Sequence, residues 1–432
     1  MSQGVQKVYS LLYNLCVIPL LFIFFHLAKY FNPKIKKGVA GRKKLFQILE
    51  QKVIGFSRNH PRVWIHAASV GEFEQARPLI DALTNQVPHI QIIQSFFSPS
   101  AYEKISEVPG IQCITYMPFD SKKNATRFLN ILQPDLAVFV RWDLWPNHLW
   151  TLRKKPVPAF LINASLHDRS LRNKSLLRGF NLSLFQGFEK IFVVSEEQKD
   201  RFKQLGIEEN LIVSGDTRCD QVWQRSQEKL AEETRLRTLF KDKLVFIAGS
   251  TWEDDELHLI LGLSELIKRK PEFLCILVPH EPTPKNMQRL GNLLNKWQLK
   301  YIFYSELMEQ STLEVPCILV DRVGILANLY KFAHIAFVGG GFGQGLHNVL
   351  EPAVYGVPVL FGPQIAKSWE AQELLRSGAV IQIHSGKQFI AEINKLLNSR
   401  AKRKEIGRRA KSWVLSHRGA TEIILKEILD YI

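Results

Sequence analysis

From residue 62 onward, short apolar runs rich in β-branched residues alternate with amphipathic stretches of helical period. Six runs in the first half are predicted strands: VWIHAAS, IQIIQSFF, QCITYM, LAVFVR, PAFLINAS and KIFVVS. Strands that alternate with helices are typical of a parallel sheet with helices packed on its faces. We therefore predict a Rossmann-like domain over residues 32–220.

A polar, charged stretch at residues 221–243 interrupts this pattern and is predicted to be a helix that links two domains. The alternation then restarts in five apolar runs: KLVFIAGS, FLCILVPH, CILVD, IAFVGGG and PVLFG. They predict a second Rossmann-like domain over residues 244–400, and the basic helical segment 401–432 is expected to pack across both domains. The length of 432 residues agrees, because a single hydrophobic core stops growing well below this size.

The two halves open with similar segments. VWIHAASVGEFEQA and LVFIAGSTWEDDEL are both predicted to form a strand, a turn with a serine and an acidic helix start. Ligands of open α/β sheets bind beyond the carboxyl ends of the strands. Both turns are therefore expected to border one cleft between the domains.

The N-terminal run LLYNLCVIPLLFIFFHLAKYF is almost entirely apolar. About 20 such residues suffice to cross a bilayer as a helix. The lysines and arginines of KYFNPKIKKGVAGRKK should keep the downstream chain on the cytoplasmic side, near anionic lipid. We predict a membrane anchor over residues 1–31 that either spans the bilayer or lies in its interface; the alternative is a buried core helix of the first domain.

The net charge of +16 favours anionic partners: nucleic acid, an acidic membrane surface or phosphorylated substrates. The five cysteines are scattered without a CxxC pair, which is typical of a reducing compartment and not of a structural zinc site. The pair His280-Glu281 lacks the second histidine of a zincin helix. We expect no protein-bound transition metal.

The segment Ser69-Val70-Gly71-Glu72 lies at the first strand-to-helix turn and matches the S-x-x-E capping box. In this motif the serine accepts a hydrogen bond from the amide three residues on, and the glutamate accepts one from the amide of the serine. Capping alone therefore accounts for both residues. The other interpretation is that Glu72 is a reacting carboxylate.

The equivalent turn of the second half is Gly249-Ser250-Thr251. Backbone amides at a helix start, together with hydroxyls, form an anion site, so a phosphate is one expected ligand. Ordinary N-capping by Ser250 or Thr251 is the alternative, because the acids at 253–256 suit the helix dipole.

The segment AFVGGGFGQGLHNVLEP places five glycines within residues 339–345, among them Gly341, where the backbone can approach a ligand closely. The loop leads to Asn348 and Glu351, which are three residues apart and share a helix face. A carboxylate there is well placed to bind vicinal ribose hydroxyls. The alternative is that Glu351 only stabilises the helix dipole.

After the strand LAVFV comes RWDLWPNHLW. Its three tryptophans are explained by core and rim packing, or they line an acceptor site together with Arg141 and Asp143. The sequence leaves both interpretations open.

The motifs HAASVGE, LWPN, GDTRCD, AGST, LVPH, AFVGGG, HNVLEP and YGVPVLFGP, in this order behind an apolar N-terminus, resemble the 3-deoxy-D-manno-octulosonic acid (Kdo) transferases of lipid A assembly. The resemblance implies a GT-B fold, in which two Rossmann-like domains face a central cleft behind an N-terminal membrane helix. It also implies a metal-independent, inverting transfer of Kdo from CMP-Kdo to a lipid A precursor (lipid IVA). The expected location is the cytoplasmic face of the inner membrane, with no cofactor and no nucleic acid partner.

The resemblance also carries residue roles. Glu72 is expected to be the catalytic base, and Arg141 and Arg218 fall where the family has charged residues that assist the transition state. The residues that fall where the family binds CMP are Pro279, His280, Val323, Gly324, Ile325, Asn348, Val349, Leu350 and Glu351. Ser250, Thr251 and Gly341 complete the expected CMP-sugar site.

Four positions depart from the family pattern. Arg141 stands at the first acid of E-x-E-L-W-P, with Asp143 at the second. His280 replaces an arginine, Ile325 replaces an acid, and Arg218 replaces a lysine and keeps its charge.

Two opposing effects act on a base at the Glu72 position. A helix N-terminus lowers the pKa of a carboxyl group, whereas burial raises it. We expect burial to prevail only in a closed, acceptor-bound state.

Competing functions are a GT-B-like sugar-nucleotide epimerase, a transferase with another donor, and a non-catalytic basic adaptor for membrane or nucleic acid. The adaptor predicts binding with a steep salt dependence and no sugar transfer. It also leaves Glu72, Asn348 and Glu351 without a role.

Overall fold

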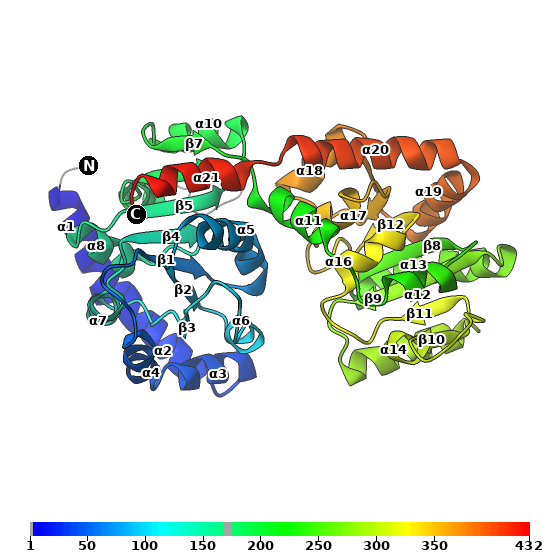
Figure 1. The fold of residues 1–432 in the computed structure, drawn as a ribbon, viewed down its shortest axis with the longest axis horizontal. Helices are drawn as coiled ribbons and strands as arrows, with labels where there is room; N and C mark the ends of the chain where they lie inside the picture. The colour runs from blue at the N-terminus through cyan, green and yellow to red at the C-terminus, as the bar shows by residue number, and fades with distance from the viewer. Residues whose placement is uncertain (1–2, 167–174) are drawn as a thin grey trace. The chain divides into compact units, whose positions relative to one another are not determined.

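The computed structural model describes residues 3–166 and 175–432. The chain divides into two compact units, one of Met1–Gln221 with Arg418–Ile432 and the other of Val222–His417. Each unit contains one sheet of seven parallel strands with helices on its faces (Figure 1). The predicted pair of Rossmann-like domains is thereby confirmed.

The first sheet has the strand order β3-β2-β1-β4-β5-β6-β7. Its strands are β1 (Arg62–Ala67), β2 (Gln91–Phe96), β3 (Cys113–Tyr116), β4 (Leu136–Val140), β5 (Ala159–Ala164), β6 (Lys190–Val193) and β7 (Leu211–Val213). The order reverses between β1 and β4, and this switch point is where open α/β sheets bind ligands.

The second sheet has the order β10-β11-β9-β8-β12-β13-β14, with its switch point between β8 and β12. Its strands are β8 (Leu244–Thr251), β9 (Phe273–Pro279), β10 (Tyr301–Phe303), β11 (Cys317–Leu319), β12 (Ile335–Val338), β13 (Val359–Phe361) and β14 (Val380–Gln382). In both units the switch point joins the first strand to the strand that opens the other half of the sheet.

The strands are apolar on both sides because helices cover both faces of each sheet. In β1, Trp64 belongs to the core cluster on one face, whereas Val63 and Ile65 belong to the cluster on the other. All three side chains are fully buried. Continuous apolar runs of this kind are typical of doubly covered parallel strands.

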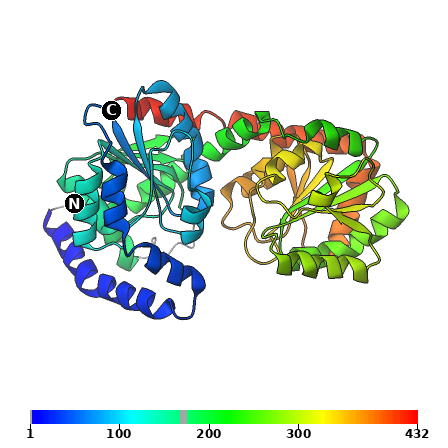
Figure 2. The ribbon, with the colours of Figure 1, turned by 60° about the horizontal axis from the view of Figure 1, so that its bottom comes forward.

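The first three helical segments of the first unit follow one another directly and form an N-terminal rod (Figure 2). The helices of the first unit are α1 (Gln3–Leu12), the π-helical turn η1 (Tyr13–Val17), α2 (Ile18–Ala28), α3 (Pro33–Gly41), α4 (Leu45–Val53), α5 (Val70–Gln86), α6 (Pro99–Lys104), α7 (Lys122–Leu132), α8 (Pro146–Lys154), α9 (Ser175–Phe185), α10 (Glu196–Leu205) and α21 (Ala420–Leu429). Helix α11 (Thr217–Gln227) begins in the first unit and ends in the second.

Among the described residues, one helix is long and apolar enough to cross a membrane, at Gln6–Ala28. Only 6% of the most apolar 18-residue stretch of this helix is buried, so it is not a core helix of the first unit. Length and composition alone do not distinguish a spanning helix from one that lies in the membrane interface.

The helices of the second unit are α12 (Glu233–Leu239), α13 (Glu253–Arg269), α14 (Pro284–Lys296), α15 (Tyr304–Leu307), α16 (Leu326–Leu329), η3 (Tyr330–Phe332), α17 (Leu350–Ala353), α18 (Trp369–Arg376), α19 (Gly386–Asn398) and α20 (Arg400–Ser416). Where the sequence predicts one linker helix over 221–243, the structure has α11 and α12. Where it predicts one helical segment over 401–432, the structure has α20 in the second unit and α21 in the first.

Helix α21 is held to the first unit by one carboxylate and an apolar face. Asp220 accepts hydrogen bonds from the amides of Gly419 and Thr421 at 2.8 Å and from the Thr421 hydroxyl at 2.8 Å. Ile424 and Ile428 join the core beneath α5. The end of the chain therefore completes the first unit.

We predict that Asp220→Ala destabilises the first unit by about 3 kcal/mol, because two buried amides lose a charged acceptor. Urea unfolding followed by tryptophan fluorescence measures the change. Asp200→Ala, which removes only a long surface contact to Lys203 at 3.8 Å, is the control and should leave the midpoint unchanged. Equal midpoints for the two variants would contradict this role of Asp220.

Candidate functional site

The first-unit candidates lie at the carboxyl edge of the sheet, with Glu72 and Arg141 at the switch point and Arg218 after the outermost strand, β7. Glu72 follows β1, Arg141 follows β4, and Arg218 follows β7 at the start of α11. Because all strands are parallel, their carboxyl ends meet on one side. The parallel topology therefore brings the three residues to one edge of the sheet.

Glu72 lies in the first turn of α5, and its carboxylate binds the end of β1. Oε2 accepts from the Ala68 amide at 2.7 Å, and Ser69 Oγ accepts from the Glu72 amide at 3.4 Å. Ser69 therefore caps the helix as predicted, but the glutamate reaches one residue beyond the serine amide that a capping box uses.

The pKa of Glu72 lies above the ordinary glutamate value. Burial raises it most and the charge of Asp143 raises it further, whereas the Ala68 amide, His66 and Arg141 lower it. A carboxyl group whose pKa moves toward neutrality is a stronger base.

A chain of hydrogen bonds links Asp143 to the core. Trp64 Nε1 donates to Ser95 Oγ at 2.8 Å, and Ser95 Oγ lies 2.8 Å from His66 Nδ1. His66 Nε2 lies 2.8 Å from Asp143 Oδ2, which also accepts from Trp145 Nε1 at 3.0 Å. A carboxylate only accepts, so the proton between His66 and Asp143 is assigned to Nε2.

Asp143, which stands at the second acid of the family's E-x-E-L-W-P pattern, is therefore held in place beside Glu72. His66 is fully buried, and the sequence analysis overlooked it. Its signal was present in VWIHAAS, where a histidine interrupts an otherwise apolar strand just before the turn.

Asp216 orients one of the two predicted arginines. Arg218 Nε and Nη2 donate to Asp216 Oδ2 at 2.9 and 2.6 Å, and the Arg218 amide donates to Oδ1 at 2.9 Å. Burial raises the pKa of Asp216, but the charge and hydrogen bonds of Arg218, helped by Arg141, lower it below 3.8 overall. Arg141 and Arg218 therefore both interact electrostatically with the Asp216 carboxylate.

A second polar network, also missed from the sequence, joins α5 to α11. Asn163 Nδ2 donates to Thr217 Oγ1 at 2.6 Å, and Thr217 Oγ1 donates to the Gln75 carbonyl at 2.6 Å. The Thr217 amide donates back to Asn163 Oδ1 at 3.1 Å. These buried contacts fix the start of α11, and with it Arg218, relative to the helix that carries Glu72.

The predicted CMP-sugar residues of the second unit also follow strand ends. Ser250 and Thr251 end β8, Pro279 ends β9 and precedes His280, and Val323–Ile325 follow β11. Gly341 and Asn348 follow β12. The topology thus brings the set to the carboxyl edge of one sheet.

Neither Ser250 nor Thr251 caps α13, which corrects the capping alternative. Trp252 occupies the N-cap position, and its amide donates to Asp255 Oδ2 at 2.9 Å. Thr251 Oγ1 donates instead to the buried Glu256 at 3.0 Å. Ser250 has a left-handed backbone, with φ of 54°.

Asp255 also occupies the amides of the glycine-rich loop. Gly340 N donates to Oδ2 at 2.7 Å, and Phe342 N donates to Oδ1 at 3.3 Å. Burial raises the pKa of Asp255, and these amides lower it only in part. The two amides are therefore committed to a side chain, and a Cβ at Gly341 would meet the backbone of Gly362 at 2.6 Å, so this glycine serves packing.

Three rings stack at the ends of β8 and β9. The centroid of His280 lies 4.8 Å from Trp252 and 4.3 Å from His347, and Trp252 Nε1 donates to His347 Nε2 at 2.9 Å. Burial and His280 lower the pKa of His347 to about 4, so this ring is uncharged at pH 7. The sequence analysis did not include Trp252 in the site.

The HN-x-LE segment only partly takes the predicted form. Helix α17 begins at Leu350 and has four residues, so Asn348 and Val349 precede it. Asn348 Oδ1 accepts from the Leu350 amide at 3.1 Å. The side chains of Val349 and Leu350 are fully buried and present only backbone to a ligand, while Glu351 is half-buried and its charge acts on Tyr330.

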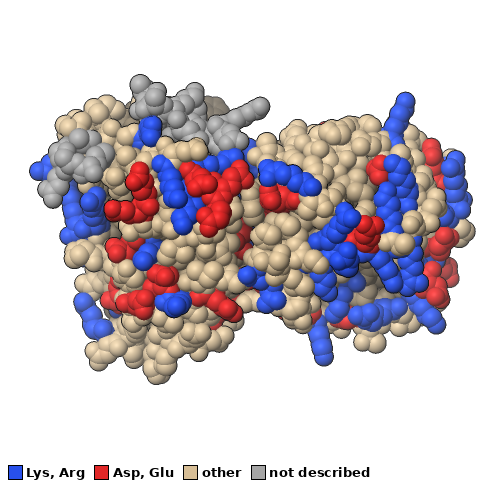
Figure 3. Space-filling view, turned by 90° about the horizontal axis from the view of Figure 1, so that it is seen from above, with Lys and Arg blue, Asp and Glu red and all other residues tan. Residues whose placement is uncertain are grey.

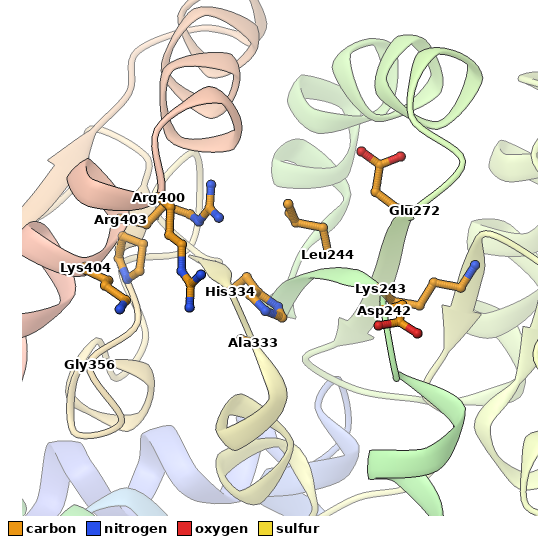
Figure 4. A pocket seen from close by; sticks show the side chains of 11 residues that line it. Asp242, Lys243, Leu244, Glu272, Ala333, His334, Gly356, Arg400, Arg403 and Lys404 are labelled. Atoms are coloured by element: carbon orange, nitrogen blue, oxygen red, sulfur yellow. The ribbon is translucent and has the colours of Figure 1, made fainter.

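A basic cavity of about 510 Å³ lies at the opposite edge of the second sheet (Figure 4). Leu244 opens β8 and His334 directly precedes β12, so the cavity borders the amino ends of the strands. Arg400, Arg403 and Lys404 of α20 line it. Figure 3 shows lysines and arginines gathered on the face of the second unit that carries this helix. This cavity is separate from the predicted CMP-sugar residues.

Over residues 3–166 and 175–432, no three histidine, cysteine, aspartate or glutamate side chains are grouped so as to hold a metal ion.

A family model described as 3-deoxy-D-manno-octulosonic-acid transferase (kdotransferase) matches residues 42–221. The chain is similar to a 3-deoxy-D-manno-octulosonic acid transferase of Rickettsia prowazekii, with 30% identity over 79% of this chain and 73% of that protein. A 3-deoxy-D-manno-octulosonic acid transferase of Haemophilus influenzae is 29% identical over 86% of this chain and 87% of that protein.

Among solved structures, a UDP-GlcNAc 2-epimerase from Neisseria meningitidis has a TM-score of 0.63. It is 16% identical and covers 85% of this chain and 100% of its own. At that identity the likeness concerns the fold alone, a GT-B-like pair of Rossmann-like units.

We predict that Arg218→Gln destabilises the first unit by about 3 kcal/mol at pH 7, because it leaves Asp216 buried and charged. A carboxylate with a lowered folded-state pKa contributes stability above its unfolded pKa and loses that contribution as pH falls through the folded value. The difference from wild type should therefore shrink between pH 5 and pH 3 in urea titrations.

Arg77→Gln is the control, since it removes only a half-exposed pair with Asp81 on α5. It should cost about 0.3–0.5 kcal/mol at either pH. A loss for Arg218→Gln that does not change with pH would rule out the ion pair as its cause.

Proposed function

Because the chain belongs to the 3-deoxy-D-manno-octulosonic acid (Kdo) transferase family, it is a glycosyltransferase, and we propose that it moves Kdo from CMP-Kdo to a lipid A precursor with inversion. Glu72 is the proposed general base. The observation that carries this proposal is the half-buried Glu72 carboxylate at the switch point of the first sheet, with its raised pKa and with Arg141 nearby.

In the proposed reaction Glu72 takes the proton from an acceptor hydroxyl. The hydroxyl oxygen attacks the anomeric carbon of Kdo from the side opposite the phosphate, and the bond from that carbon to the CMP oxygen breaks. The Ala68 amide holds Oε2 at 2.7 Å and fixes the carboxyl group in orientation. General base catalysis of this kind contributes typically 10²–10⁴-fold.

The arginines have a proposed electrostatic role. Kdo carries a carboxylate and CMP leaves with a charged phosphate, so negative charge accumulates around the reacting carbon. Arg141 acts on both Glu72 and Asp216, and Arg218 is paired with Asp216, which supports this role for the two cations. Preorganised cations stabilise such charge without the cost of reorientation during the reaction.

The proposed CMP-sugar site lies in the second unit. The stacked rings of His280 and His347 offer a flat surface for a base, and Ser250 offers a hydroxyl to the phosphate. Glu351 and Asn348 remain the proposed ribose contacts. Since Asp255 occupies two loop amides, phosphate binding is assigned to Ser250 and neighbouring amides.

The proposed location is the cytoplasmic face of the inner membrane. It is supported by the apolar helix at Gln6–Ala28 and by the exposed lysines Lys34, Lys36 and Lys37 that follow it. Such an order of apolar and basic residues is typical of a segment held at an anionic membrane surface.

The first test is incubation of the purified protein with CMP-Kdo and tetraacylated lipid A precursor, followed by mass measurement of the lipid. Glu72→Gln should lower the rate by about 10²–10⁴-fold and leave the melting temperature and CMP-Kdo binding unchanged, because glutamine still accepts from the Ala68 amide. Glu74→Gln, on the same helix, is the matched control and should retain activity.

An unchanged lipid with wild-type protein would overturn the proposed function. Loss of folding in Glu72→Gln would instead support a purely structural capping role.

The pH dependence of kcat/KM tests the base separately. The acid limb should lie above pH 4.5, since burial and Asp143 both raise the pKa of Glu72. Asp143→Asn keeps a side chain that can accept from Trp145 but removes one raising charge, so its limb should move to lower pH. A limb that stays in place would exclude Glu72 as the titrating base.

A further inference from the structure

The N-terminal helix is fastened to the first unit along one side. Tyr13 Oη donates to Asp120 Oδ2 at 2.9 Å, and Asn14 and Asn147 exchange hydrogen bonds at 2.9 and 3.1 Å. Asp120 is fully buried and lies 2.7 Å from His148 Nδ1. These polar contacts fix the rod of α1, η1 and α2 in register against the unit.

The other sides of the rod are apolar and exposed. The exposed apolar residues that do not line the groove described below are Val8, Leu11, Leu12, Leu15, Val17, Leu20, Ile23, Phe24 and Leu27. A helix that is docked on a globular unit cannot cross a bilayer without carrying that unit into the hydrocarbon, where unsatisfied polar groups are costly. The rod is therefore suited to lie in the plane of a lipid surface, with the lysines of α3 beside it.

An apolar groove runs under this rod. One cavity of about 210 Å³ is walled mainly by the apolar side chains of Ile18, Leu21, Phe22, Phe25, Phe119 and Trp145, and its polar lining residues are His26, Asp120, Ser121 and Asn124. A second cavity of about 90 Å³ shares Phe25 and Phe119 with the first.

The second cavity continues along α3 to Val39 and Phe97. The ring of Phe25 lies 5.0 Å from that of Phe119 and 5.9 Å from that of Phe97, so the walls of the two cavities are continuous.

The groove reaches a residue that contacts the charged neighbour of the candidate base. Trp145 forms part of the wall of the larger cavity, its ring centroid lies 4.7 Å from that of Phe97 in a tilted arrangement, and its Nε1 donates to Asp143 at 3.0 Å. Asp143 is the charged neighbour that acts on Glu72. Apolar surface under the lipid-facing rod is thus connected, through one tryptophan, to the reacting carboxylate.

We propose that this groove holds a fatty acyl chain of the acceptor lipid and thereby positions the acceptor hydroxyl at Glu72. This inference rests on the proposed function, in which the acceptor is a lipid. An acyl chain matches an aromatic and aliphatic lining with few polar atoms, whereas a sugar or phosphate would leave its polar groups unpaired there. Binding energy from a remote chain is then used for orientation at the reacting centre.

Leu21→Trp tests the proposal, because it fills the larger cavity from α2. Leu20→Trp is the matched control, since the adjacent residue is 66% exposed and points away from the groove. Both variants are compared with wild type in lipid vesicles on a tetraacylated acceptor and on the same sugar phosphate without acyl chains. Circular dichroism and vesicle flotation check folding and membrane binding.

The expected result is a rise of at least tenfold in KM for the acylated acceptor with Leu21→Trp, no change for the deacylated acceptor, and no change in either assay with Leu20→Trp. Equal effects of Leu21→Trp on both acceptors would overturn the proposal, as would an unaffected KM. Equal effects of Leu21→Trp on the two acceptors are also the result expected if the groove holds a bulk phospholipid.

A binding measurement separates this inference from the proposed function. A tetraacylated precursor with photoreactive acyl chains should crosslink to peptides that contain Leu21, Phe119 or Trp145, and Leu21→Trp should reduce the yield. Crosslinks at these residues in a protein that transfers no sugar would overturn the proposed function alone. Transfer without such crosslinks would overturn the groove alone.

Discussion

The parallel direction of every strand is the constraint from which the site follows. It places fourteen carboxyl ends on the corresponding edges of two sheets, seven in each, and leaves the chemistry to the loops that begin there. Glu72 and Arg141 come from segments 69 residues apart, yet they flank the same switch point because β1 and β4 are neighbours. The N-terminal rod is packed against the same unit, so its exposed apolar surface and the candidate reacting groups belong to one unit.

The two similar turns, after β1 and after β8, differ in which backbone amides their carboxylates bind. After β1, the Ala68 amide binds a carboxylate that stays close to the site, and Glu72 combines orientation with a raised pKa. After β8, Asp255 takes the Gly340 and Phe342 amides and serves the loop conformation. A carboxylate that accepts hydrogen bonds from backbone amides is therefore the candidate base in the first unit, whereas in the second unit it stabilises the conformation of the glycine-rich loop.

The fold could be predicted from the sequence because its strands are apolar on both faces and are separated by helices that often begin at a serine, as at Ser69 and Ser195. The position of Glu72 at a strand-to-helix turn followed from the same pattern. The pairing of His66 with Asp143, in contrast, depends on which strands are neighbours, and local sequence does not contain that information. Likewise, the five glycines within residues 339–345 indicated available amides, but not that a side chain from α13 would occupy two of them.

The return of the last residues to the first unit bears on how the protein is made. During synthesis, residues 1–221 emerge long before α21, so Asp220 lacks its three donors and the core beneath α5 lacks Ile424 and Ile428. The first unit therefore reaches its final stability only after the second unit has been translated and α21 has left the ribosome. Tyr13 and Asn14 of the N-terminal rod, by contrast, find Asp120 and Asn147 early, while about half of the chain is still to be translated.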